Sequence, residues 1–439
     1  MVAATERTLQ VRCLAPNFEE TRGDRVLLIW GDLPFWMVVD QEAAQFIRDL
    51  AADGSPRGAG REGAEVLRGL RRGGVWGGRR REPARERLES ISLNVTNRCN
   101  LRCAFCYNAG RPPQSKEVTA EEMVAALEGV RRWIAPGALL ALLGGEPLLE
   151  REKTLALAAW ARRRGLSPLL STNGLLVDRV FAEEAARLGL DCQVSVDGAC
   201  AQTHEQMRGA GTFAPALEGV RLLVEAGAPT LISMVVHAGN APEVPDFLRL
   251  GRSLGVRAAR FIPLKRVGDG RGHAAPDLPA LIRQVAHTVA AEPDLAGLLG
   301  RDYCSILART CQACSPRASC GTGSQTFLLD ADGTVYPCPN LARPELAVGS
   351  ITREPLRRIW RTAPIMLETR RRVRSVLAGG ACGRCEVHHW CLGGCRGEVY
   401  AETGKLEARS VTCEMNRAAI LETMWTVAGA SQGGPDHAH

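Results

Sequence analysis

The 439-residue sequence lacks any apolar run close to the roughly 18 residues that a membrane-spanning helix needs. Its first residues, MVAATERTLQVRC, also lack the basic-then-apolar pattern of a secretory signal. These two absences argue against a membrane or secreted protein, and we expect the protein to be cytoplasmic. With 45% hydrophobic and 23% charged residues, the composition is typical of soluble globular domains, and the length allows two or three of them.

A strong charge bias is also lacking, since the formal net charge is only +7. Seven arginines gather in the glycine-rich stretch RRGGVWGGRRREPARER at 71–87. Such a stretch is either a nucleic-acid footprint or a solvated linker, and its glycines and Pro83 favour a linker between domains. We therefore expect no nucleic-acid partner.

Cysteine, by contrast, is abundant: the chain has sixteen, of which ten lie between Cys304 and Cys413. In a reducing compartment this abundance indicates metal binding or catalysis rather than disulfides. Three others, Cys99, Cys103 and Cys106, lie in the stretch NRCNLRCAFCY at the spacing C-x3-C-x2-C. Iron–sulfur clusters usually have four cysteine ligands, so three thiolates on one loop would leave one iron of a 4Fe–4S cluster open. The competing interpretation is a zinc knuckle with a distant fourth ligand.

This loop resembles that of the radical S-adenosylmethionine (radical SAM) enzymes, and Phe105 matches the aromatic residue that usually precedes the third cysteine. The resemblance implies that Cys99, Cys103 and Cys106 hold a catalytic 4Fe–4S cluster whose open iron is chelated by S-adenosylmethionine. In that family the reduced cluster cleaves the sulfonium to give methionine and a 5′-deoxyadenosyl radical. That radical abstracts hydrogen from an unactivated carbon.

Residues 91–300 alternate short apolar runs with amphipathic stretches, as repeated βα units do. We expect an α/β fold in which these units form a partial (β/α)6 TIM-like barrel, with catalytic groups at the carboxyl ends of its strands. The cysteine loop directly follows the first predicted strand. The predicted strands are Ile91–Val95, Leu139–Leu143, Pro168–Ser171, Gln193–Val196, Leu231–Val236 and Ala259–Pro263, and two predicted helices are Ala120–Trp133 and Glu152–Arg164.

Further motifs follow the predicted strands in the order that radical SAM enzymes have. Gly144, Gly145 and Glu146, followed by a proline, resemble the GGEP motif that contacts the methionine amino group. Glycines allow a close backbone approach, and a carboxylate accepts from an ammonium. The stretches STNG at 171–174 and SVDG at 195–198 resemble the family's next two motifs. The resemblance implies a ribose or carboxylate contact for Ser195, while Asp197 is either a binding or a structural residue.

The stretch THEQMRGAGTF at 203–213 resembles the segment whose arginine pairs with the methionine carboxylate. Arg208 is the matching residue, and a guanidinium suits this role because it binds a carboxylate through two hydrogen bonds.

The C-terminal cysteines form a second pattern, which resembles the SPASM domain, an extension of radical SAM enzymes that carries two auxiliary 4Fe–4S clusters. Cys382, Cys385, Cys391 and Cys395 follow C-x2-C-x5-C-x3-C ahead of Cys413, and Cys320, Gly333 and Cys338 follow C-x12-G-x4-C. The family pairing implies one cluster on Cys314, Cys320, Cys338 and Cys395 and another on Cys382, Cys385, Cys391 and Cys413. Cys304 and Cys311 compete with Cys314 as ligands, and a pair of zinc ribbons is the alternative for the region.

In the N-terminal block, Val26–Trp30 and Phe35–Val39 predict two strands, and Gln41–Ala52 and Glu62–Arg72 predict two helices. This order, and the stretch LPFWMVVDQEAAQFIRDL, resemble the winged-helix recognition element of enzymes that modify ribosomally synthesised peptides (RiPP maturation). The resemblance implies that a leader peptide binds by adding a strand to an exposed sheet edge. A structural cap on the barrel is the alternative.

Together these features predict a radical SAM oxidoreductase that matures a ribosomal precursor peptide, most simply by cross-linking two side chains. The implied cofactors are S-adenosylmethionine and three 4Fe–4S clusters, and the implied electron donor is a reductase, flavodoxin or ferredoxin. The predicted domains are a peptide-recognition domain (1–80), a linker (81–90), the barrel (91–300), the SPASM domain (301–425) and a disordered tail (426–439).

Three alternatives stay open at this point. One is a small-molecule enzyme, such as one that trims tetrapyrrole side chains, against which the N-terminal domain argues. Another is a sulfatase-type maturase, but that family places an aspartate directly after the cysteine matching Cys338, where this chain has Pro339. The last is a non-catalytic zinc or nucleic-acid-binding protein.

Overall fold

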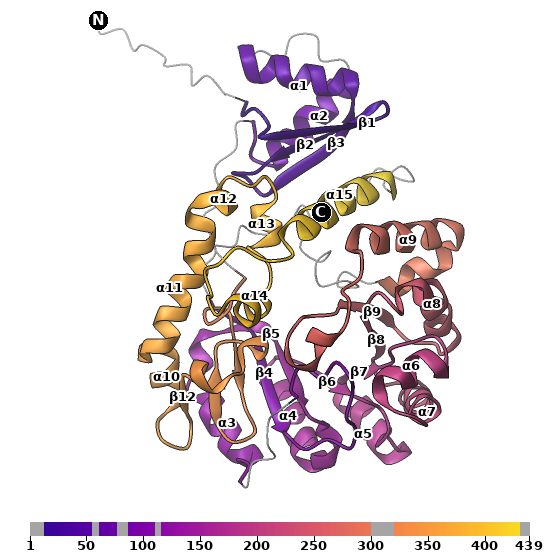
Figure 1. Ribbon diagram of the computed structural model, residues 1–439, viewed down its shortest axis with the longest axis vertical. Coiled ribbons are helices and arrows are strands. Elements are labelled where there is room, and N and C mark those ends of the chain that lie inside the picture. The colour runs from indigo at the N-terminus through magenta and orange to yellow at the C-terminus, as the bar shows by residue number, and fades with distance from the viewer. Residues whose placement is uncertain (1–12, 55–60, 77–86, 110–115, 300–319, 431–439) are drawn as a thin grey trace, which may run out of the picture.

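A mostly parallel sheet forms the centre of the protein (Figure 1). The computed structural model describes residues 13–54, 61–76, 87–109, 116–299 and 320–430. The sheet has nine strands in the order β12-β11-β10-β4-β5-β6-β7-β8-β9. Its parallel run is β4 (Leu88–Thr96), β5 (Ile134–Gly144), β6 (Ser167–Thr172), β7 (Asp191–Ser195), β8 (Thr230–Val236) and β9 (Ala258–Pro263). These strands include the six that the sequence predicts, so the α/β partial barrel is confirmed.

The connecting helices other than α6 bury their apolar sides with the strands in one continuous core. They are α3 (Ala120–Glu128), α4 (Arg151–Arg163), α5 (Arg179–Leu188), α6 (Ala201–Arg208), α7 (Phe213–Glu225), α8 (Val244–Ser253) and α9 (Leu278–Ala291). Local sequence sets their ends. Thr119 and Glu122 form a capping box at the start of α3. Helix α3 is shorter than predicted because Gly129 ends it, and a short turn at Arg131–Trp133 follows.

The C-terminal region extends the barrel sheet, which the sequence did not predict. Strand β10 (Thr326–Leu329) pairs in parallel with β4, and β11 (Thr334–Tyr336) and β12 (Gly349–Ser350) follow in antiparallel order. The rest of this region is helical: α10 (Leu356–Thr362), α11 (Pro364–Ala378), α12 (Gly380–Gly383), α13 (His388–Cys391), α14 (Arg396–Thr403) and α15 (Cys413–Ala430). The cysteine-rich region is therefore joined to the first barrel strand by backbone hydrogen bonds.

The N-terminal region has its own sheet, in the order β1-β2-β3, followed by two helices. Strands β2 (Arg25–Trp30) and β3 (Phe35–Asp40) and helices α1 (Gln41–Asp53) and α2 (Arg61–Arg72) match the predicted elements. Strand β1 (Phe18–Arg22) was not predicted, because its sequence FEETR carries no apolar alternation. Strand β2 is apolar from Val26 to Trp30 because both of its faces are buried.

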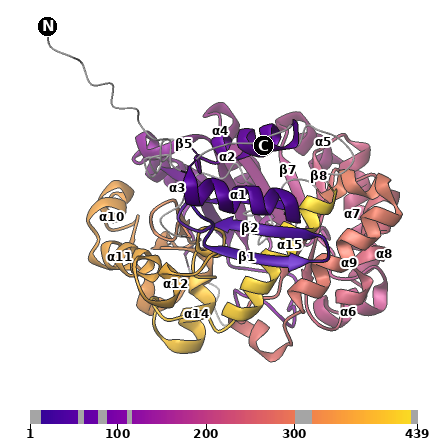
Figure 2. The same ribbon diagram turned by 90° about the horizontal axis from the view of Figure 1, so that it is seen from above.

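The two faces of this sheet pack against different partners. Val26, Leu28 and Trp30 join the core formed with α1 and α2. The opposite face packs on the C-terminal region in a second cluster of Leu27, Ile29, Trp36, Val387, Trp390, Ile420, Leu421 and Met424. Figures 1 and 2 show the N-terminal sheet lying over α15, which in turn contacts α9 of the barrel. Helix α15 thus lies between the N-terminal sheet and the barrel.

Ile420 lies in this apolar contact, and its side chain is 1% exposed. We therefore expect Ile420→Ala to weaken the contact. Truncating a buried isoleucine typically costs about 2–5 kcal/mol, and here the loss falls on the contact between the N-terminal sheet and α15. We expect faster amide hydrogen exchange in β2 and β3, with exchange in β5–β7 unchanged. The matched control is Val427→Ala on the same helix, whose side chain is 43% exposed. Equal exchange in the two variants would contradict this packing role.

Two predicted boundaries differ from the structure. Strand β4 begins at Leu88, inside the stretch predicted as a linker, and α15 continues past residue 425 to Ala430. The predicted tail begins too early because the apolar residues of α15 spread around much of the helix. They do not form the single amphipathic stripe that would mark its end in the sequence. Among the helices of the described ranges, none combines the length and apolarity that crossing a bilayer requires.

Candidate active site

A cavity of about 530 Å³ opens at the carboxyl ends of β4, β5, β6 and β7. This volume is in the range of small-molecule sites. The structure brings together here every residue predicted for the first cysteine loop and for cofactor contact. They are Cys99, Cys103, Phe105, Cys106, Gly144, Gly145, Glu146, Ser195 and Arg208.

The three thiols of the first loop lie near one another. Burial raises the pKa of each, and a neighbouring cysteine raises it further: Cys106 for Cys99, Cys99 for Cys103, and Cys103 for Cys106. The Arg208 guanidinium offsets part of this effect, and its Nη1 lies 3.8 Å from the Cys103 Sγ. In the described part of the chain, no group of three or more Cys, His, Asp or Glu side chains converges on a single-ion site. Three neighbouring thiols beside a cation fit a thiolate-bound cluster with a net negative charge.

The start of this loop is held by two carboxylates that the sequence did not reveal. Glu117 Oε1 accepts hydrogen bonds from the Thr96 hydroxyl (2.8 Å) and the Asn97 backbone N–H (2.9 Å). Asp330, directly after β10, accepts from the side-chain amides of Asn94 (2.8 Å) and Asn97 (3.0 Å). Asp330 could not be found from the sequence, because its role depends on the pairing of β10 with β4.

The glycines of the GGEP stretch let β5 approach this loop closely. A Cβ atom at Gly144 would lie 2.2 Å from the Thr96 carbonyl oxygen, and one at Gly145 would lie 2.2 Å from that of Arg98. In this close approach, Gly145 N–H donates to Thr96 O and Glu146 N–H donates to Arg98 O, both at 2.8 Å. The glycines therefore position the cysteine loop against the end of β5.

We expect Gly145→Ala to lower iron loading of the first loop and S-adenosylmethionine cleavage at least tenfold. The added Cβ meets backbone atoms of Arg98, so the loop has to move. Iron analysis and chromatography of 5′-deoxyadenosine measure the effect. The control is Gly297→Ala, where an added Cβ would meet nothing within 4 Å. Wild-type loading and cleavage in Gly145→Ala would contradict the positioning role.

Glu146 joins the ends of two strands. Its Oε1 accepts from Leu148 N–H (3.0 Å) and the Thr172 hydroxyl (2.7 Å), and its Oε2 accepts from Asn173 N–H (2.8 Å). Burial raises the pKa of this carboxyl, while these donors and Arg208 act in the opposite direction. The side chain is 1% exposed yet lines the cavity, so it presents a buried acceptor to a bound ligand.

Arg208 and Asp197 form a buried ion pair, through Arg208 Nε and Asp197 Oδ2. Asp197 also accepts a hydrogen bond from Val235 N–H at 2.7 Å and is completely buried. The structure therefore gives Asp197 a supporting role. It holds the Arg208 guanidinium over the Phe105 ring, with Cζ 5.6 Å from the ring centroid. A cation and a buried carboxylate that line one cavity suit a ligand that carries both an ammonium and a carboxylate.

The segment after β9 closes over the cysteine loop, and sequence reasoning missed it. Asp269 N–H donates to Cys106 O (3.1 Å), His273 Nε2 lies 3.0 Å from Ala104 O, and Asp269 lines the cavity. Gly268 has a φ of +56°, and a Cβ there would lie 2.3 Å from Cys106 O. The run GDGRG is the available sequence signal, since glycines in series often mark a close backbone approach.

The C-terminal cysteines fall into two neighbouring groups. Burial and the charges of Cys395 and Cys320 raise the pKa of Cys338 to about 12. Burial and the charges of Cys391 and Cys413 likewise raise the pKa of Cys385 to about 11. Burial and the charges of Cys413 and Cys382 raise the pKa of Cys391. The resemblance assigns the members of each group to one auxiliary cluster, and this assignment stays a prediction. Cys314 and its competitors Cys304 and Cys311 lie outside the described residues.

Comparison with known proteins agrees with this arrangement. A family model described as the radical SAM superfamily matches residues 93–251, and the SPASM model, described as an iron–sulfur cluster-binding domain, matches 320–386. An AdoMet-dependent heme synthase of Methanosarcina barkeri is 30% identical, over 72% of this chain and 93% of that protein. Mycofactocin maturase MftC of Mycobacterium ulcerans is 29% identical, over 70% and 82%. The structure of Streptococcus suis SuiB bound to precursor peptide SuiA covers 90% of this chain and 100% of that one, with 14% identity and a TM-score of 0.58.

Proposed function

The chain belongs to the radical SAM superfamily and carries a SPASM domain, and from this premise we propose that it oxidatively modifies side chains of a ribosomal precursor peptide. A cross-link between two side chains is the proposed product. When bound, a 4Fe–4S cluster and S-adenosylmethionine supply a 5′-deoxyadenosyl radical that abstracts hydrogen from carbon.

The residues of the first cavity would hold and orient this cofactor. Cys99, Cys103 and Cys106 would ligate the cluster, and Glu146 and Arg208 would receive the ammonium and the carboxylate of S-adenosylmethionine. Ser195, at the end of β7, would contact its ribose or carboxylate. The close fit of β5 against the loop, through Gly144 and Gly145, keeps these groups in register.

The observation that carries the peptide assignment is the N-terminal sheet and its position. In the described sheet β3 is an edge strand, and edge strands readily accept a further strand from a peptide. The face of the N-terminal sheet that points away from α1 and α2 packs against α15, which begins at Cys413. A leader bound at β3 would therefore be anchored to the same unit that carries the C-terminal cysteines. SuiB, which has the same fold, was determined with a bound precursor peptide.

Two auxiliary 4Fe–4S clusters, on the two groups of C-terminal cysteines, would complete the cofactor set. Forming a bond between two side chains removes two hydrogens: one is abstracted as an atom, and the other leaves as a proton and an electron. The auxiliary centres would supply an acceptor for that electron. A reductase, flavodoxin or ferredoxin would provide the electron for S-adenosylmethionine cleavage.

A small-molecule substrate is the second candidate, because the heme synthase of Methanosarcina barkeri matches over 93% of its own length. A tetrapyrrole or similar precursor would then occupy the barrel. The sulfatase-type reaction is a weaker candidate, since Pro339 replaces the aspartate which that family places after the cysteine.

The decisive experiment is anaerobic co-expression of the enzyme with a short peptide encoded beside its gene. We expect the peptide mass to fall by two hydrogens, with tandem mass spectrometry locating the linked residues. Cys99→Ala is the inactive control. An unchanged mass leaves epimerisation, which chiral amino-acid analysis detects. Unchanged mass and chirality would contradict the peptide assignment and favour the small-molecule substrate.

A further inference from the structure

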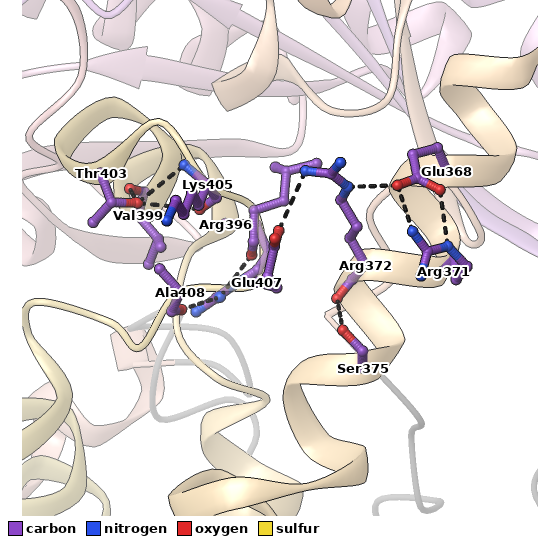
Figure 3. Close-up of polar contacts among 11 residues, drawn as sticks. Glu368, Arg371, Arg372, Ser375, Arg396, Val399, Thr403, Lys405, Glu407 and Ala408 are labelled. Carbon is purple, nitrogen blue, oxygen red and sulfur yellow. Dashed lines mark hydrogen bonds and ion pairs between the residues drawn. The ribbon is translucent and has the colours of Figure 1, made fainter.

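Arg396 is a buried cation without a carboxylate partner among the described residues. It follows Cys395 at the start of α14 and is 1% exposed. Its Nη1 donates to the backbone carbonyls of Leu406 (2.9 Å) and Ala408 (2.8 Å), as Figure 3 shows for the Ala408 side. Its Nε and Nη2 have no hydrogen-bond partner within the described ranges. Leaving charged donors buried and unpaired is costly, so these N–H groups point to a missing acceptor.

The surroundings of Arg396 identify the chemical nature of that acceptor. Burial lowers the pKa of its guanidinium, while the charges of Cys320, Cys395, Cys382 and Cys391 act in the opposite direction. Two of these cysteines belong to each C-terminal group. On another side, a Cβ at Gly393 would lie 3.4 Å from Nη2, so the absence of a side chain there keeps the guanidinium uncovered. Arg396, which directly follows Cys395, is therefore a buried cation near cysteines of both groups.

A nearby arginine shows how this region satisfies a guanidinium by ordinary means. Arg372 on α11 reaches Glu368 Oε1 at 2.6 Å and Glu407 Oε2 at 3.5 Å. Figure 3 shows Arg372 bridging these two carboxylates while Arg396 lies in the adjoining segment. The difference in partners indicates that Arg396 is placed to meet negative charge from something other than a carboxylate.

We propose that Arg396 is the counter-cation of the auxiliary iron–sulfur centres, donating its Nε and Nη2 hydrogens to sulfur atoms of both cysteine groups. This role rests on the proposed function, which assigns clusters to these cysteines. Net charge, burial and hydrogen bonds to sulfur set the potentials of such centres. A cation stabilises the reduced cluster most, because reduction adds one negative charge. Arg396 thus raises the potential of both centres and favours acceptance of an electron from substrate.

Arg396 is a positioning residue in this account, and the reduction potential is the quantity that tests it. The measurement is a potentiometric titration followed by electron paramagnetic resonance, on full-length protein carrying Cys99→Ala so that only auxiliary centres contribute. We expect Arg396→Met to lower the ratio of reduced to oxidised centres at a given potential at least tenfold, or about 59 mV for a one-electron couple. Arg372→Met is the matched control and should leave the ratio unchanged.

The outcomes separate the two levels of the proposal. Full iron content with a wild-type potential in Arg396→Met would overturn the role of Arg396. If Arg396→Met loads no iron, Arg396→Lys decides: a ratio lowered at least threefold supports the role, because lysine lacks the two-sided fork, and a wild-type ratio overturns it. A Cys99→Ala parent without auxiliary iron would overturn the cluster assignment itself, which the iron count reports separately.

Discussion

Replacing Cys99 by alanine is expected to abolish production of 5′-deoxyadenosine while the auxiliary iron is retained. Cys99 is one of three thiols on the loop at the cavity, and two thiolates cannot hold a cluster that requires three protein ligands. The C-terminal cysteines belong to separate groups and depend on none of the loop thiols. Iron and sulfide analysis should show the loss of one four-iron cluster, and chromatography should show product below detection.

A matched control for this prediction is Cys200→Ala. Cys200 is an exposed cysteine outside both cysteine patterns, at the start of α6. Its replacement should change neither iron content nor product. Retained cleavage in Cys99→Ala would refute the catalytic role of the loop, and equal losses in both variants would indicate general instability.

The parallel strands and the loops at their ends were predictable because their signals are local. A buried parallel strand reads as an apolar run, and each motif follows such a run within a few residues. The same is true of β2, whose run VLLIW predicts a strand. What the run could not reveal is that α15, nearly four hundred residues later, covers one of its faces.

The parts that escaped prediction depend on contacts between distant segments. Asp330 holds Asn97 because β10 pairs with β4, and that pairing has no signature in the short run TFLL. His273 approaches Ala104 through a loop whose path is set by the barrel. The sequence could also not separate binding from support at Asp197. The resemblance implied a contact to cofactor for the arginine, and the structure adds the aspartate that holds it.

This buried pair leads to the second large effect, an expected loss of stability in Asp197→Ala. The Asp197 carboxylate is completely buried, and the Arg208 side chain is 10% exposed. Removing one partner of a buried ion pair typically costs about 3–5 kcal/mol, because the remaining charge is left without compensation. Asp197→Ala also loses the hydrogen bond from Val235 N–H. We expect a lower Tm in anaerobic calorimetry of the holoenzyme and weaker S-adenosylmethionine binding.

The double variant Asp197→Ala with Arg208→Met separates support from binding. Replacing both charges by apolar groups removes the uncompensated arginine, so the Tm should recover relative to Asp197→Ala alone. Affinity for S-adenosylmethionine should not recover, because the guanidinium that would receive its carboxylate is absent. If affinity returned together with stability, Arg208 would have no part in cofactor binding, and the pair would serve only to hold β7, α6 and β8 together.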